Sequence, residues 1–159
     1  MVSNYKNWTH EDLERVESVD SYEAMLDLAL KILPRLGQPI AQVCGPLSTG
    51  GRGSFEKNLE MFSEGIEFLH NQGKIVFDQR PFEVPMQKLK NSREKGGYAF
   101  DLLDKFYLPV FESGYIKEMH FLPGWDGSTG AKWEHEQANR LGISIYYFPE
   151  SFINNRQVF

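Results

Sequence analysis

The sequence predicts an α/β fold, and two observations carry the prediction. Short apolar runs alternate with longer segments of helical periodicity between residues 39 and 148. Residues 40–77 follow the order strand, glycine-rich loop, helix, strand, which is the crossover unit that joins parallel strands. We therefore expect a three-layer, Rossmann-like or flavodoxin-like parallel sheet, preceded by an N-terminal helical extension. Ligands of such sheets bind beyond the carboxyl ends of the strands.

The helical extension is expected to cover residues 1–38, ahead of an α/β domain at 39–159. Thr9 is placed to cap a short helix, with Asp12 near its positive end. Apolar residues at three- and four-residue spacing then predict a second helix over 20–36.

The α/β domain contains the remaining predicted elements. Strands are predicted at 40–44, 74–77, 115–122 and 143–148, and helices at 55–69, 98–111 and 129–141. A connection as long as 78–97 is uncommon in a compact domain, so we expect a short helix there, a mobile lid, or both. Residues 149–159 read as a tail.

Charge and composition narrow the possible partners. The 159 residues include 17 Lys and Arg against 22 Asp and Glu, a net charge of -5, which argues against duplex nucleic acid as a partner. A local basic loop can still bind a small anion in an acidic protein. Cys44 is the single cysteine, no His or Cys cluster has metal-ligand spacing, and no apolar run is long enough for a membrane span. We expect a cytoplasmic protein without metal, membrane or cofactor.

The first candidate site is the glycine-rich loop 45–54, which opens the helix at 55–69. Its four glycines allow close backbone approach to a ligand, and a helix N-terminus favours an anion. Hydroxyls at Ser48, Thr49 and Ser54 and the guanidinium of Arg52 suit a phosphate. The alternative is a plain turn in which Ser54 only caps the helix.

The second candidate site is the loop 124–130 with the helix that follows it. Asp126 lies in the loop, and Glu134 shares a helix face with the core-type residues Ala131 and Ala138. A carboxylate on a buried stripe costs free energy unless it has partners, so Glu134 is a catalytic candidate. A structural ion pair or a position at the exposed rim is the alternative.

Three further residues close to these loops have a structural interpretation. We expect His135 to be a surface histidine and Cys44 to be a buried packing residue. Trp125 is placed either to stack on a base or to pack in the core.

The two loops together resemble the nucleoside 2-deoxyribosyltransferase-like superfamily, which includes the nucleoside-monophosphate N-glycosidases and many uncharacterised members. The resemblance covers about residues 39–148. It rests on Gly45-Pro46 after an apolar strand, on Asn58 and Phe77-Asp78, and on Leu122-Pro123-Gly124-Trp125 followed by Ser128-x-Gly130-Ala131-x-x-Glu134-x-x-x-Ala138-x-x-Leu141-Gly142. Two positions depart from it, since many members have a tyrosine where this chain has Gln42 and a Cys-Asp pair where it has Ser113-Gly114.

The resemblance implies an N-glycosidase or deoxyribosyltransferase that cleaves the N-glycosidic bond of a nucleotide or ribosyl phosphate. In it, Glu134 is the nucleophile and Asp126 protonates or positions the leaving base. It also implies a homo-oligomer. The substrate-binding residues are then Gly45, Pro46, Ser48, Thr49, Gly51, Arg52, Gly53, Ser54, Asn58, Asp78, Trp125 and Ser128. The alternatives are a nucleotide-binding or sensing domain without turnover, and a structural or partner-binding protein whose loops are only turns.

Overall fold

The computed structural model describes residues 5–47, 51–91 and 102–154, and the chain divides into two compact units. A helical unit comprises residues 1–37 and 77–115, and a sheet unit comprises residues 38–76 and 116–159. The N-terminal helices thus belong with a segment that the predicted boundary assigns to the α/β domain. The domain limits 1–38 and 39–159 remain a prediction.

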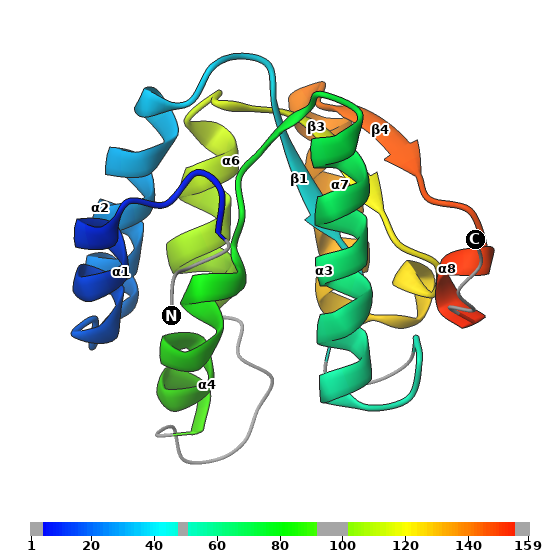
Figure 1. Cartoon of the computed structure of the whole chain (residues 1–159), viewed down its shortest axis with the longest axis horizontal. Helices are drawn as coiled ribbons and strands as arrows, with labels where there is room; N and C mark the ends of the chain where they lie inside the picture. The colour runs from blue at the N-terminus through cyan, green and yellow to red at the C-terminus, as the bar shows by residue number, and fades with distance from the viewer. Residues whose placement is uncertain (1–4, 48–50, 92–101, 155–159) are drawn as a thin grey trace. The chain divides into compact units, whose positions relative to one another are not determined.

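The sheet unit is built on four parallel strands, as the sequence predicts (Figure 1). They are β1 (Ile40–Cys44), β2 (Ile75–Val76), β3 (Ile116–Phe121) and β4 (Ser144–Tyr147), in the order β2-β1-β3-β4. Cys44 pairs with Phe121, and Phe121 pairs with Tyr147. The carboxyl ends of three strands therefore lie level at one edge.

Helices cover both faces of this sheet, which gives the α/β three-layer arrangement. Val43 of β1 packs in a core cluster with residues of α3 (Phe55–Asn71). The next residue, Cys44, points to the other face and lies beside Glu134 of α7 (Thr129–Leu141). A short helix, α8 (Ser151–Asn154), lies within the stretch predicted as a tail and contacts α3.

The packing of α3 follows from its apolar stripe. Ser54 caps the helix by accepting a hydrogen bond from the Lys57 backbone N–H. The buried side of α3 then covers the apolar face of β1 and β2, and each large side chain buried there contributes roughly 1.5–3 kcal/mol. The cluster consists of Ala41, Val43, Met61, Phe62, Ile66, Leu69, Val76, Leu122 and Phe148.

The helical unit contains the N-terminal helices and the segment between β2 and β3. Its elements are α1 (His10–Glu17), α2 (Tyr22–Ile32), η1 (Leu33–Arg35), η2 (Arg80–Phe82), α4 (Glu83–Asn91), the π-helical turn η3 (Leu103–Tyr107) and α6 (Leu108–Glu112). The predicted cap of α1 is confirmed, since Thr9 and Asp12 form a reciprocal capping box. The short helix expected within 78–97 is confirmed by η2 and α4. The remainder of that segment, 92–97, lies outside the described residues.

Two predicted helices differ in detail from the structure. The second N-terminal helix ends at Ile32 and tightens into η1, because Pro34 cannot continue the α-helical bonding. The predicted helix at 98–111 is described from residue 102 onward. It widens into the π turn just before Pro109, whose ring does not fit against the carbonyl four residues earlier.

Candidate functional site

The two glycine-rich loops meet at the carboxyl edge of the sheet, as predicted. A Cβ on Gly45 would lie 2.9 Å from the Cβ of Leu122, so β1 and β3 deliver the loops side by side. Gly51 has a φ of 57°, and a Cβ there would lie 2.5 Å from the Asn58 Oδ1. Gly124 has a φ of 89°, and a Cβ there would lie 3.2 Å from the Cα of Gly51. Both positions need glycine, for the left-handed backbone and for the close approach.

Asn58 of α3 holds the first loop in place. Its side chain is fully buried; Nδ2 donates to the Leu47 carbonyl at 2.9 Å, and Oδ1 accepts from the Arg52 N–H at 2.8 Å. The two bonds span the loop from its start to its end. Ser48 and Thr49, predicted to contact a phosphate, lie outside the described residues.

Arg52 points into the protein. Its side chain is 6% exposed, and its Nη2 lies 2.6 Å from the Glu64 Oε1. Its Nε donates to the Phe152 carbonyl at 3.0 Å. A phosphate would have to compete with Glu64 for this guanidinium, so a phosphate contact of Arg52 stays a prediction and its described role is to tie the loop to α3 and α8.

Three further predicted residues of the first loop, Pro46, Gly53 and Ser54, have different surroundings. Ser54 caps α3, so its hydroxyl oxygen already accepts one backbone N–H. Pro46 is buried, and its Cγ lies close to where side chains on Gly51 or Gly124 would extend. Gly53 has a φ of 103°, and no described atom lies within 4 Å of the position of its missing Cβ. The described part of the loop thus leaves open space beside Gly53.

Glu134 lies at the buried side of α7, at the strand end where the loops meet. Its exposure is 8%, and Ala131 and Ala138 of the same face are buried as well. Its carboxylate interacts with the thiol of Cys44. Burial, above all, raises the pKa of that thiol, and the charge and hydrogen bond of Glu134 raise it further. The thiol therefore stays protonated at neutral pH, where it donates to the carboxylate.

The contact between Cys44 and Glu134 is only partly visible in the sequence. Cys44 is buried, as expected. Its polar contact crosses from a strand to a helix far along the chain, and no local spacing indicates it. Glu136, the neighbouring acid that the sequence places on the solvent side, is exposed.

An aromatic stack holds the second loop. The Trp125 ring lies 4.2 Å from the His135 ring at an interplanar angle of 12°. The His135 Nε2 is in hydrogen-bond contact with the Tyr147 hydroxyl at 2.8 Å. His135 is therefore half-buried and held on both sides rather than free at the surface. Its partners lie in η4 (Trp125–Gly127) and β4, which the sequence does not place together.

Asp126 and Ser128 flank the start of α7. Ser128 caps the helix by accepting from the Ala131 N–H at 3.2 Å. Asp126 is exposed within η4. The roles of Asp126 toward a leaving base and of Ser128 toward a substrate stay predictions.

Asp78 belongs to the helical unit. Its buried carboxylate accepts from the Arg80 Nε at 2.9 Å and from the Arg80 Nη2 at 2.6 Å. Its backbone carbonyl accepts from the Trp8 indole N–H at 2.8 Å. These bonds give Asp78 a structural role within that unit, and its predicted contact with a ligand stays a prediction.

Lys74, Glu118 and His120 form a charged cluster at β3 that no sequence pattern indicates. Glu118 accepts from Lys74 at 3.1 Å and lies 2.9 Å from the His120 Nε2. Burial alone would raise the pKa of Glu118, but the bonds from His120 and Lys74 hold it below its usual value. The pKa of His120 is lowered, chiefly by burial. The cluster faces the α3 side, because the centroid of the His120 ring lies 6.1 Å from that of Phe148, which belongs to the core cluster under α3.

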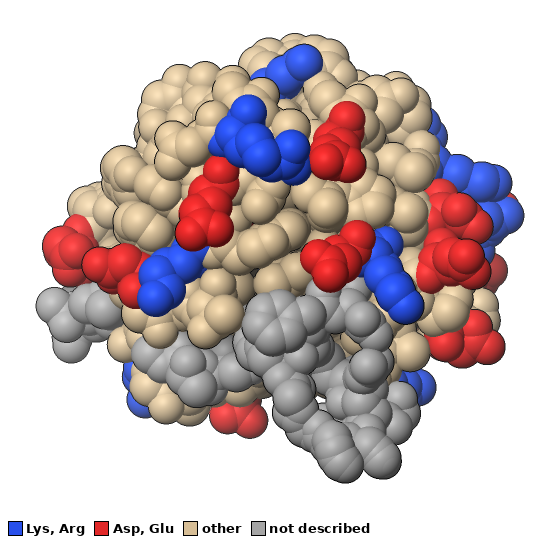
Figure 2. Space-filling model, turned by 180° about the vertical axis from the view of Figure 1, so that it is seen from behind, with Lys and Arg blue, Asp and Glu red and all other residues tan. Residues whose placement is uncertain are grey.

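No family model, curated protein or solved structure matches the chain. Over residues 5–47, 51–91 and 102–154, no three His, Cys, Asp or Glu side chains gather to hold a metal. No helix in the part of the chain that is described has the length and apolarity to cross a membrane. On the face shown in Figure 2, acidic and basic side chains are interspersed rather than gathered into one basic patch.

Proposed function

We propose that the chain binds a nucleotide or a related ribosyl phosphate at the carboxyl edge of its sheet and cleaves the N-glycosidic bond. Glu134 is the nucleophile in this proposal. The observation that carries it is the placement of Glu134, a carboxylate only 8% exposed, at the strand end where two glycine-rich loops meet. The resemblance of the loop and helix motifs to deoxyribosyltransferases and nucleotide N-glycosidases supports the same assignment.

The chemistry needs one carboxylate and one proton source. A Glu134 oxygen attacks the anomeric carbon, and the electron pair of the breaking C–N bond leaves with the base. The base takes a proton from Asp126 or from water. Water then hydrolyses the glycosyl ester and restores the carboxylate, or a second base accepts the sugar instead. No cofactor is required for either outcome.

The first loop supplies the anion site in this proposal. Backbone N–H groups at the start of α3 favour a phosphate through hydrogen bonding and the helix dipole. The open space beside Gly53, a glycine with left-handed backbone, allows a ligand to approach the main chain closely. The internal bonds of Arg52 and Asn58 hold the loop ready for such an approach.

Binding without turnover is a second candidate function, favoured by the same low exposure of Glu134. A nucleophile has to come within roughly 3–3.5 Å of the atom it attacks. Glu134 is only 8% exposed, so a ligand could bind between the loops without reaching its carboxylate. Such a ligand would be bound and not cleaved. The chain would then sense a nucleotide.

One experiment separates these functions. The full chain is incubated with a panel of nucleoside monophosphates and NAD, free base is measured by liquid chromatography, and ligand binding is followed by thermal shift. We expect base release by the wild type, a loss of at least about 1000-fold in Glu134→Gln, and unchanged rates in the matched control Glu136→Gln. A thermal shift without base release in the wild type favours the binding function. If the wild type shows no thermal shift and no base release, both functions are contradicted.

A further inference from the structure

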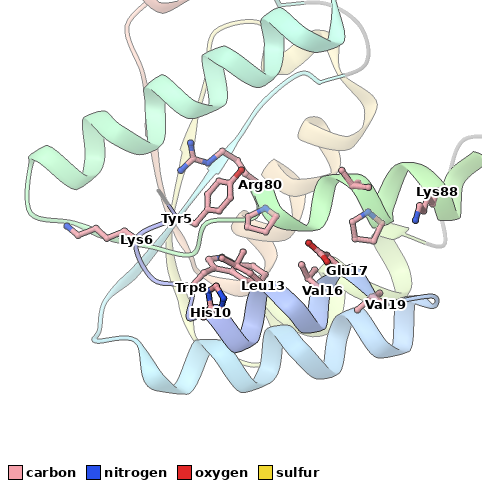
Figure 3. A pocket seen from close by; sticks show the side chains of 13 residues that line it. Tyr5, Lys6, Trp8, His10, Leu13, Val16, Glu17, Val19, Arg80 and Lys88 are labelled. Atoms are coloured by element: carbon pink, nitrogen blue, oxygen red, sulfur yellow. The ribbon is translucent and has the colours of Figure 1, made fainter. Parts of the chain in front are cut away.

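The helical unit carries a groove of about 1320 Å³ between α1 and the η2–α4 segment (Figure 3). Pockets for drug-sized ligands are smaller, roughly 300–1000 Å³. The groove therefore suits a stretch of polypeptide better than a metabolite. It lies within one unit, and none of the residues in the proposed site of Glu134 lines it.

The floor of the groove is apolar. Trp8 and Val16 are buried beneath it, Leu13 is half-buried, and Pro81 and Pro85 line the opposite wall. Val84, in the first turn of α4, is 67% exposed. Val84 and the half-buried Leu13 are therefore the apolar side chains that a partner would contact most readily.

The shape of the floor favours a helix as the occupant. Leu13, Val16 and Val19 follow one another at three-residue intervals along and just beyond α1, so they form an apolar stripe along the floor. A partner helix with apolar residues at i, i+3, i+4 and i+7 presents a matching stripe.

The charged residues that line the groove indicate which charge a partner should carry. The charged lining residues are three cations (Lys6, Arg80 and Lys88) against one carboxylate (Glu17), in a chain whose net charge is -5. Arg80 is neutralised by Asp78 and lies over the Tyr5 ring at 5.0 Å. Lys6 and Lys88 stand at opposite ends of the groove in Figure 3. Acidic residues at both ends of a bound helix would meet them.

We propose that this groove binds an amphipathic helix of a partner protein, with acidic residues flanking an apolar stripe. The proposal does not depend on the activity assigned to Glu134. Apolar contact with Leu13 and Val84 supplies most of the affinity, and the two lysines select an acidic partner over a basic one.

The test uses a displayed library of helical peptides selected on the full wild-type chain and counter-selected on Val84→Glu. We expect enriched peptides to carry apolar residues at helical spacing with acidic flanks. Fluorescence anisotropy with the leading peptide should show a Kd at least about 10-fold weaker for Val84→Glu, and weaker for Lys88→Glu. Lys132→Glu, an exposed charge reversal on α7 in the sheet unit, should leave the Kd unchanged.

Three results would overturn the proposal. One is a lack of enrichment over the Val84→Glu counter-target. Another is enrichment of basic or proline-rich extended peptides. The third is sedimentation showing a wild-type oligomer that Val84→Glu dissociates, because the occupant would then be a second copy of the chain.

Discussion

The two glycine-rich loops end neighbouring strands and open helices on opposite faces of the sheet, yet they are held in different ways. Hydrogen bonds and an ion pair hold the first loop, through Asn58 and Arg52. Ring stacking holds the second, through Trp125 and His135. In the described part of the first loop, the Arg52 guanidinium and the Ser54 hydroxyl are both bonded within the protein, so what that part offers a ligand is its main chain. Beside the second loop, the carboxylate that we propose as nucleophile, Glu134, lies on the buried side of α7 rather than in the loop itself.

This contrast predicts that substituting a single polar group costs much of the free energy of unfolding in the first loop and little in the second. A buried polar bond is costly to break because the abandoned partner loses both water and its bond. A ring stack loses only part of its contact area when one member changes.

The largest effect is expected for Asn58→Leu. The substitution removes the hydrogen bonds to the Leu47 carbonyl and from the Arg52 N–H. It should lower the free energy of unfolding, measured in urea, by about 2–4 kcal/mol. The same change at the exposed Asn139 of α7, whose Nδ2 donates one hydrogen bond to the His135 carbonyl, should cost under about 0.5 kcal/mol. Equal losses for the two variants would contradict the two-bond account.

Arg52→Leu comes next, at about 2 kcal/mol, because Glu64 and the Phe152 carbonyl lose a charged donor. Glu64 is 42% exposed and can be hydrated, so the control Glu64→Gln should cost under about 1 kcal/mol. Urea unfolding measures both. A gain in stability for Arg52→Leu, without loss of ligand binding, would show that the bonds do not hold the loop.

A smaller effect is expected from pH, and it originates in the cluster on β3 rather than in either loop. The folded pKa of His120 lies below its ordinary 6.5, so protonation favours the unfolded chain and stability falls as pH drops below about 6.5. The folded pKa of Glu118 lies below its ordinary 4.5, so a second loss begins as pH falls through that value. Thermal unfolding between pH 8 and 4 measures both steps. His120→Gln should remove the first step and reduce the second, because the contact with His120 helps hold the pKa of Glu118 down. An unchanged profile would contradict the assignment of the first step to His120.

The smallest effect is expected for Tyr147→Phe, which removes the hydroxyl that contacts His135 and keeps the ring. Because Tyr147 is 58% exposed, the loss should be about 0.5 kcal/mol in urea. A loss as large as that of Asn58→Leu would erase the distinction between the loops.

Local patterns were sufficient for much of this architecture. The apolar run at β1, the stripe of α3 and the Thr9 cap each depend on residues close in sequence, and the structure confirms them. Parallel order then brought both loops to one edge. The bonds of Arg52 could not be predicted, because the Phe152 carbonyl lies 100 residues away in a helix that no periodicity indicates. The grouping of the N-terminal helices with residues 77–115 likewise depends on contacts between distant segments.

The most direct test of the central claim is release of free base from nucleoside monophosphates by wild type and Glu134→Gln, with folding of both checked by thermal unfolding. The account predicts release by the wild type and its near-complete loss in a folded Glu134→Gln. Base release that persists at the wild-type rate in Glu134→Gln would contradict the assignment of Glu134 as the nucleophile.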